Sequence, residues 1–126
     1  NLFSKAKAEN RAVLLGYIPA GFPDKAGCKA MISAMAQGGV DAVEIGFPYS
    51  DPVMDGPIIQ AAAEQSLKHG TGAKEVFKTL AAVTALGVPA VVMTYWNPIE
   101  KYGVSEFAQS IKAAGGSGVI IISAYF

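Results

Sequence analysis

Apolar residues follow two different patterns along the chain. Four short runs are almost continuously apolar, which is typical of strands that are buried on both faces. These predicted strands are 12–18, 40–45, 90–94 and 119–122. Between the runs, apolar residues recur at the spacing of one helix face, which predicts helices at 2–10, 28–36, 57–68, 71–86 and 105–114.

Polar and turn-forming residues mark the boundaries of these elements. Asp24 is placed to cap the helix that carries Cys28, and Pro57 suits the first position of a helix. Thr71 is the candidate N-cap of the next helix, with Glu75 near its start. The segment 95–103 is predicted to be a loop.

The order of the elements predicts a parallel sheet with helical crossovers. A (β/α) barrel of the TIM type and an open doubly wound sheet both fit this pattern. The barrel is favoured because the chemistry-bearing loops follow the first three strands, the end at which such barrels place their sites. A closed barrel needs about 250 residues, so residues 1–126 are expected to form a single partial domain, a half-barrel with about the first four strands.

Composition narrows the class of protein. Hydrophobic residues make up 52% of the 126 residues, enough to bury a sizeable core, and 10 basic residues balance 10 acidic ones. The basic footprint of a nucleic-acid binder is therefore missing. Apolar runs are far shorter than the ~20 residues of a membrane span, and no basic-then-apolar leader opens the sequence. We expect a soluble, cytoplasmic protein with no nucleic-acid or membrane partner.

The single cysteine and the single histidine offer little chemistry. Cys28 excludes an internal disulfide and a multi-thiolate metal site, and its helical spacing with Ile32 predicts a small buried hydrophobe. His69 lies where a helix ends, just before Gly70, a position that suits a polar ring. No metal site is predicted.

The candidate chemistry lies in the second predicted strand and the loop after it. Glu44 stands between two apolar residues of the strand, and a carboxylate buried in this way is usually paired or used as an acid or base. An outward position at a sheet edge is the alternative for Glu44. Asp51 and Asp55, in the stiff loop that follows, are each compatible with plain turn chemistry. Asp41 is expected to be a solvated residue at the strand entrance.

Three strings of the sequence resemble the tryptophan synthase alpha chain family. They are EIGFPYSDPVMDGPIIQ at 44–60, LGYIPAGFPD at 15–24 and MTYWNP at 93–98. The first string is long and specific, and together the three extend the resemblance over nearly the whole chain. The last residues, 123–126, depart from the Pro-Asp-Leu-Pro that usually follows the fourth strand of the family.

The resemblance implies a lyase that cleaves indole-3-glycerol phosphate into indole and glyceraldehyde 3-phosphate in tryptophan biosynthesis. The alpha chain would need no cofactor, since pyridoxal phosphate is expected only in the partner beta chain. Glu44 carries over as the proton-transfer group and Asp55 as the carboxylate that stays ionised beside the indole N–H. Tyr17 and Tyr95 carry over as substrate-binding walls of the pocket, with ordinary packing as the alternative.

The resemblance also implies a partner and an incomplete site. Pro48, Asp51 and Asn97 carry over as positions that face the beta chain in an alpha-beta-beta-alpha complex. The phosphate-binding loops of the family have no counterpart in these residues, so the fragment alone is expected to be inactive or nearly so. The helix at 2–10 would cover the bottom of the barrel.

Two non-catalytic interpretations stay open beside the lyase. One is a module that docks the beta chain, and the other is a half-barrel that self-associates through its first and last strands. The homo-oligomer is expected because unpaired strand edges and an apolar inner face favour association. The runs 12–18 and 119–122 contain no lysine or proline, the residues with which natural edge strands prevent pairing.

Overall fold

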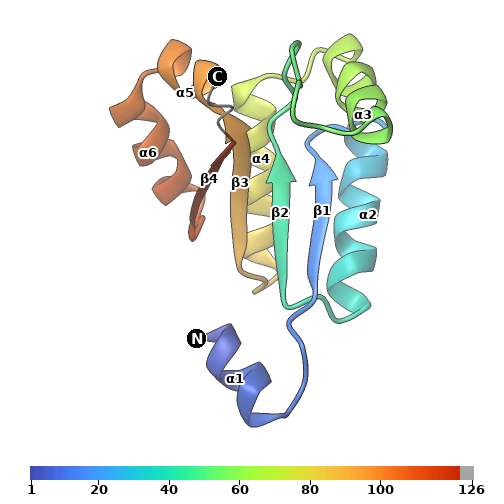
Figure 1. Cartoon of the computed structure of the whole chain (residues 1–126), viewed down its shortest axis with the longest axis vertical. Helices are drawn as coiled ribbons and strands as arrows, with labels where there is room; N and C mark the ends of the chain where they lie inside the picture. The colour runs from blue at the N-terminus through green and yellow to red at the C-terminus, as the bar shows by residue number, and fades with distance from the viewer. Residues whose placement is uncertain (123–126) are drawn as a thin grey trace.

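A computed structural model describes residues 1–122 of the chain, and the expectations for Ser123–Phe126 lie outside this part. It contains four strands and six helices among the described residues (Figure 1). In chain order they are α1 (Leu2–Ala8), β1 (Leu15–Pro19), α2 (Lys25–Gln37), β2 (Ala42–Gly46), α3 (Pro57–Lys68), α4 (Ala73–Ala85), β3 (Ala90–Tyr95), α5 (Trp96–Tyr102), α6 (Val104–Ala113) and β4 (Gly118–Ile122).

The four strands form one parallel sheet in the order β1-β2-β3-β4. Each strand therefore lies beside its neighbour in the sequence, as in a (β/α) barrel, whereas a doubly wound sheet reverses its strand order partway. The expectation of a half-barrel is confirmed. All four strands point the same way, so their C-terminal ends and the loops that follow lie at one end of the sheet (Figure 1).

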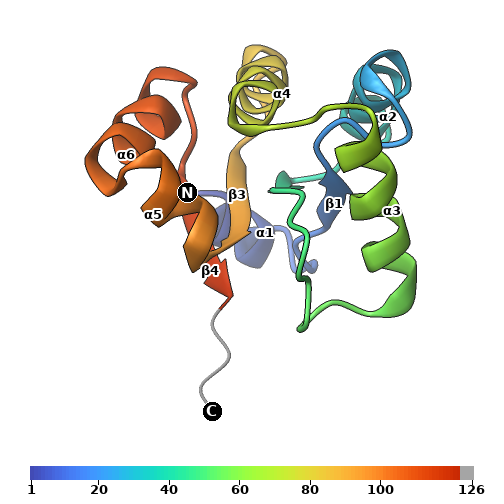
Figure 2. The same cartoon turned by 90° about the horizontal axis from the view of Figure 1, so that it is seen from above.

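Helices cover only one face of the sheet. Viewed from above, α2, α4 and α6 lie side by side along that face (Figure 2). The core between the two layers is fully apolar at its centre, where Val76, Leu80 and Val83 of α4 have no exposed surface. Burying a side chain of this size stabilises the fold by about 1.5–3 kcal/mol. The predicted inward stripe of α4 is therefore what holds this helix on the sheet.

Several helix boundaries follow the predicted signals. The Asp24 carboxylate accepts a hydrogen bond from the Gly27 amide at 2.7 Å, and Pro57 begins α3. The predicted cap at Thr71 is wrong, because Thr71 is buried one residue further out and Gly72 is the N-cap. There the Glu75 carboxylate accepts from the Gly72 amide at 3.3 Å, which lowers the pKa of Glu75.

The predicted loop at 95–103 is also wrong, since Trp96–Tyr102 forms α5. The Asn-Pro pair does not prevent a helix here because Pro98 lies in its first turn, where amides have no partner within the helix. β3 ends at Tyr95 and α5 follows directly. The chain turns without a connecting loop at the end of β3.

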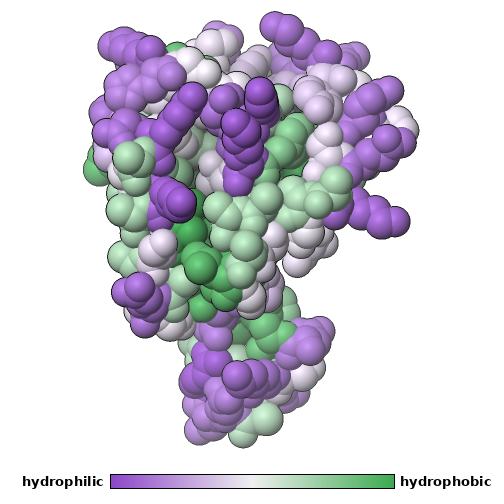
Figure 3. All heavy atoms as spheres, turned by 180° about the vertical axis from the view of Figure 1, so that it is seen from behind, coloured by the Kyte–Doolittle hydropathy of each residue, from purple (hydrophilic) through white to green (hydrophobic). Residues whose placement is uncertain are grey.

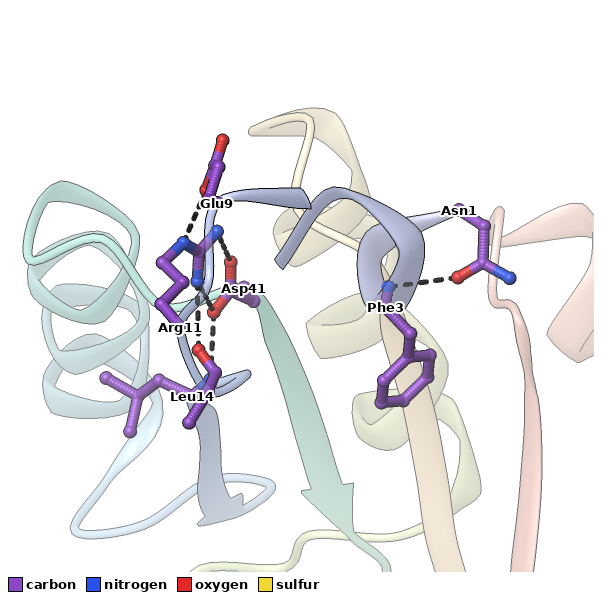
Figure 4. Close-up of polar contacts among 7 residues, drawn as sticks. Asn1, Phe3, Glu9, Arg11, Leu14 and Asp41 are labelled. Atoms are coloured by element: carbon purple, nitrogen blue, oxygen red, sulfur yellow. Dashed lines mark hydrogen bonds and ion pairs between the residues drawn. The ribbon is translucent and has the colours of Figure 1, made fainter. Parts of the chain in front are cut away.

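The N-terminal helix is attached by an ion pair at the bottom of the sheet (Figure 4). The Arg11 guanidinium donates to both carboxylate oxygens of Asp41 at 2.8 Å, and it also pairs with Glu9. Asp41 further accepts from the Leu14 amide at 2.8 Å, just before β1 begins. The expectation that Asp41 is simply solvated is wrong. Arg11 first, and then the Leu14 amide, lower the pKa of Asp41 to about 2.

Polar and apolar side chains are both exposed on the surface. Hydrophilic residues are spread over the helix-covered side and over α1 (Figure 3). On the strands themselves, Leu15, Ile120 and Ile121 are exposed. β1 also includes Pro19, contrary to the expectation that this edge strand has no proline. Within residues 1–122, the helices are all too short and too polar to span a bilayer.

Candidate active site

Glu44 is the one residue of β2 that is not buried. Its neighbours Val43 and Ile45 belong to the core between the sheet and the helices. Because side chains alternate along a strand, Glu44 lies on the opposite face, which no helix covers. No hydrogen bond or ion pair to its carboxylate occurs within residues 1–122. β2 lies between β1 and β3, so the alternative of a position at a sheet edge is wrong, and the carboxylate lies on the open inner face.

Tyr17 lies beside Glu44 on the same face. The register of β1 and β2 pairs Tyr17 with Glu44, and side chains of paired residues in a parallel sheet point the same way. The Tyr17 ring leans along the strand over Gly46, where a Cβ atom would come within 2.2 Å of the tyrosine hydroxyl. Only glycine leaves room for the ring there. Gly46 is the last residue of β2, and its lack of a side chain allows Tyr17 to lie there.

Tyr95 and Asp55 approach from the other side of β2. Tyr95 ends β3 and is buried, and its hydroxyl accepts a hydrogen bond from the Met54 amide at 2.9 Å. That bond places Asp55, the next residue of the loop, close to the Tyr95 hydroxyl. Burial raises the pKa of Tyr95, the Asp55 carboxylate acts in the same direction, and the Met54 amide opposes both.

The electrostatics of Tyr17 show that the four side chains share one region. Burial raises the pKa of Tyr17 to about 12, and the nearby Asp55, Tyr95 and Glu44 act in the same direction. Charges influence a pKa this way only across short distances, since solvent screens longer ones. The structure thus brings together the predicted residues Tyr17, Glu44, Asp55 and Tyr95, which come from β1, β2, the loop after β2, and β3.

The loop that carries Asp55 is anchored on both sides of this residue. Besides the Met54–Tyr95 bond, the Gln60 side chain in α3 donates to the Asp55 carbonyl at 2.8 Å and to the Pro52 carbonyl at 3.2 Å. The Asp55 amide donates to the same Pro52 carbonyl at 3.0 Å. These bonds form a turn, as the turn interpretation of Asp55 predicts. The turn fixes the backbone at Asp55, and a turn role is compatible with a catalytic role for its carboxylate.

The three predicted partner positions lie at the same end of the sheet, and two of them share a groove. Pro48 and Asn97 line a groove of about 460 Å³ between the loop after β2 and the start of α5. Asp51 lies outside the groove, exposed, and accepts a hydrogen bond from the Ser50 hydroxyl at 2.8 Å. The neighbouring Val53 and Met54 are 66% and 56% exposed, so this loop presents apolar side chains to solvent.

The remaining candidates take structural places. Cys28 is 3% exposed in the core, and burial raises the pKa of its thiol, as expected for a small hydrophobe. His69 forms the C-cap of α3. Within residues 1–122, no three side chains of His, Cys, Asp or Glu gather in a way that could hold a metal ion.

A family model described as "Tryptophan synthase alpha chain" matches residues 3–124 of the chain. The chain belongs to the tryptophan synthase alpha chain family. It is 57% identical over 120 residues to the tryptophan synthase alpha chain of Nocardia farcinica, covering 95% of this chain and 45% of the relative. The alpha chain of Thermobifida fusca is 57% identical over 117 residues, covering 93% of this chain and 43% of that relative.

Solved structures of tryptophan synthase have the same fold. A ligand-free mutant form from M. tuberculosis matches with a TM-score of 0.95 and 45% identity, covering 98% of this chain and 50% of that one. The alpha subunit from Legionella pneumophila matches with a TM-score of 0.91 and 34% identity, covering 97% of this chain and 47% of the other. The chain thus spans about half the length of the tryptophan synthase alpha chains that it matches.

Three residues that shape the site are not predicted from the sequence. Gln60 is only the last residue of the string at 44–60, yet its side chain holds the carbonyl of Asp55. Gly46 is compatible with the start of a loop, although it ends β2 under the Tyr17 ring. Tyr49 resembles the other apolar residues of its loop, and its hydroxyl accepts from Asn97 at 2.7 Å. The only sequence feature that could have pointed to Tyr49 is its hydroxyl group, which lies in a stiff, proline-rich loop.

Proposed function

We propose that this chain supplies the acid–base residues of a lyase that cleaves indole-3-glycerol phosphate into indole and glyceraldehyde 3-phosphate. The observation that carries the proposal is the convergence of Glu44, Asp55, Tyr17 and Tyr95 on the uncovered face of the sheet, toward the C-terminal ends of three adjacent strands. Barrels of this type place their chemistry at that end. Membership of the tryptophan synthase alpha chain family supports the choice of substrate.

The reaction is a retro-aldol cleavage, and Glu44 is suited to both of its proton transfers. The ring carbon that bears the side chain gains a proton, the adjacent hydroxyl loses one, and the bond between the two carbons breaks to give indole and an aldehyde. One proton is gained and one is lost, so the reaction balances without an external acid, base or redox partner. Glu44 has no partner within residues 1–122 that would compete for its proton, and it lies on the open face beside Tyr17.

Asp55 has the complementary role of stabilising charge. Protonation of the ring carbon places positive charge on the indole nitrogen, and an ionised carboxylate that accepts the indole N–H offsets this charge. Tyr17 lies beside Glu44, and Tyr95 lies beside the residue that precedes Asp55, so both rings are placed next to the carboxylates that would meet a flat ring. The ring would therefore lie between two aromatic walls with one carboxylate for proton transfer and one for charge.

The experiment that tests this function is an indole-release assay on the complete protein with indole-3-glycerol phosphate. Wild-type protein should release indole, and the Glu44→Gln and Asp55→Asn variants should both lose most of this activity while unfolding at the wild-type temperature. Full activity in both variants would overturn the proposed function. His69→Asn serves as a control, since His69 forms the C-cap of α3 and is not one of the four site residues.

We propose further that the end of the sheet that carries the site docks the beta chain, in which pyridoxal phosphate is bound. The groove lined by Pro48 and Asn97, and the exposed apolar side chains of Val53 and Met54, support a protein partner there. A mixing experiment with the beta chain tests this proposal. Asn97→Ala should weaken complex formation several-fold, and Lys29→Ala on α2 should not. Equal affinities for the wild type and both variants would contradict the proposal.

The 126 residues by themselves are expected to be inactive and to self-associate. Leu15 and Ile120 are exposed on strands at the two edges of the sheet, where pairing or burial against a second copy would remove them from water. Sedimentation of the isolated chain at micromolar concentration should give a dimer or a larger species. A stable 13.0 kDa monomer would contradict this expectation.

A further inference from the structure

A chain of contacts leads from the surface of α5 to the backbone beside Asp55. The exposed Asn97 side chain donates a hydrogen bond to the Tyr49 hydroxyl at 2.7 Å. The ring of Tyr49 packs on the ring of Tyr95, with centroids 5.1 Å apart and planes tilted by 33°. The Tyr95 hydroxyl in turn accepts the Met54 amide at 2.9 Å. Each contact joins residues that lie far apart in the sequence or in different elements.

The last contact fixes one of the two sides of Asp55. On the C-terminal side, Gln60 of α3 holds the Asp55 carbonyl at 2.8 Å. On the N-terminal side, the bond from the Met54 amide to Tyr95 joins the residue next to Asp55 to β3. Losing this anchor would leave the Asp55 peptide held by Gln60 and by the turn to Pro52, with no bond from the adjoining Met54 to β3. The direction of the Asp55 carboxylate therefore depends on where the Tyr95 hydroxyl lies.

The Tyr95 hydroxyl is held in place by its surroundings, and Tyr49 is the part of them that belongs to the loop itself. Tyr95 is 9% exposed at the end of β3, and the Tyr49 ring packs against its ring. Offset and tilted aromatic pairs contribute about 0.5–1.5 kcal/mol beyond the area they bury. The Asn97 hydrogen bond favours this arrangement of the Tyr49 ring, because swinging the ring toward solvent would break the bond.

We propose that Tyr49 is a positioning residue for Asp55: its hydroxyl on Asn97 and its ring on Tyr95 hold the Tyr95 hydroxyl where it accepts the Met54 amide. This inference rests on the proposed function for its kinetic consequences and on geometry alone for its structural ones. Asn97 also lines the groove proposed to receive the beta chain. A partner that displaces the Asn97 side chain would therefore affect the position of Asp55 through the rings of Tyr49 and Tyr95.

The structural test measures hydrogen exchange of the Met54 amide in the complete protein. This amide should be protected in the wild type, exchange at least several-fold faster in Tyr49→Phe, and lose protection in Tyr95→Phe. Tyr102→Phe is the matched control, since it also removes a tyrosine hydroxyl bond, to Ser110 at 3.1 Å, and should leave the Met54 amide unchanged. Unaltered exchange in both Tyr49→Phe and Tyr49→Ala would overturn the inference whatever the protein catalyses.

The kinetic test separates positioning from general packing. Tyr49→Phe should lower kcat for indole release about three- to tenfold with little change in KM, and unfold at the wild-type temperature. In an Asp55→Asn background the same substitution should have no further effect, because the group that it positions is already gone. An equal loss in both backgrounds would overturn the inference. If Asp55→Asn itself is fully active, the proposed role of Asp55 fails, and the exchange result still decides the role of Tyr49.

Discussion

Two carboxylates belong to the β2 region, Asp41 directly before the strand and Glu44 in its middle, and their surroundings differ. Asp41, at the N-terminal end, accepts two bonds from Arg11 and one from the Leu14 amide. Glu44, the middle residue of β2, has no partner within residues 1–122. The bonds of Asp41 hold the structure together. An unpartnered carboxylate such as Glu44 is instead available for proton transfer. The comparison separates a structural end of the half-barrel from a chemical end.

The largest expected effect is the loss of the chemical carboxylate. In the complete protein, Glu44→Gln should lower indole release by at least about a hundredfold, the usual worth of a positioned acid or base. The substitution keeps the shape of the side chain, so unfolding temperature and binding of the beta chain should stay at wild-type values. More than about a tenth of wild-type turnover in this variant would remove Glu44 from the proton-transfer role.

Asp55→Asn should have the next largest effect and differ in kind. The amide oxygen still accepts the indole N–H, but it carries no charge to offset the cation that forms on the ring. Turnover should fall about ten- to a hundredfold, mainly in kcat. Steady-state kinetics over a range of substrate concentrations check this prediction. An unchanged kcat with a raised KM would instead show that Asp55 only binds the substrate.

At the structural end, Asp41→Asn should affect stability and leave chemistry alone. The variant keeps an acceptor for the Leu14 amide but loses the ion pair with Arg11, so the unfolding temperature should fall by a few degrees. The pKa of Asp41 is lowered to about 2, so its stabilising effect is complete above pH 4 and lost as pH falls toward 2. The unfolding temperatures at pH 7 and pH 2.5 should differ less in the Asp41→Asn variant than in the wild type. An altered kcat would mean that the two ends are not independent.

The smallest expected effect is a loss of stability at alkaline pH that depends on Tyr17. The pKa of Tyr17 is raised from 10.0 to about 12, so the folded state keeps the phenol neutral when the unfolded chain already ionises. The stability that this contributes is complete below pH 10 and is lost as pH rises from 10 to 12. The unfolding temperature should therefore fall more steeply between pH 9 and 12 for the wild type than for Tyr17→Phe. Parallel curves would show that burial and the nearby Asp55 do not raise the pKa of Tyr17 in the folded state.

Much of this division can be predicted from the sequence, because it depends on periodicity and local signals. Continuous apolar runs predict the four strands, and Asp24 and Pro57 mark helix starts that the structure confirms. Glu44 is conspicuous because a carboxylate between apolar strand residues is costly to bury without a partner. The three strings, through the family that they resemble, add Asp55, Tyr17 and Tyr95, and the geometry brings all four together.

The features that the sequence does not reveal depend on contacts between distant residues. The pairing of Arg11 with Asp41 spans 30 positions, and nothing local distinguishes Asp41 from a solvated aspartate. α5 is hidden by its Asn-Pro pair, which is compatible with a first helical turn but equally with a loop. The bond between Asn97 and Tyr49 spans 48 positions, so the anchoring of the loop is visible only in three dimensions.

The proton-transfer role of Glu44 is tested most directly by solvent deuterium exchange at the ring carbon of indole that is protonated in the cleavage. Incubating indole with the complete protein in deuterated buffer isolates the proton transfer, because no carbon–carbon bond needs to break. We predict that the wild-type protein catalyses the exchange, followed as loss of the carbon-bound proton signal by NMR, and that Glu44→Gln reduces the rate to that of free indole. Exchange at the wild-type rate in Glu44→Gln would contradict the assignment of this β2 carboxylate to proton transfer.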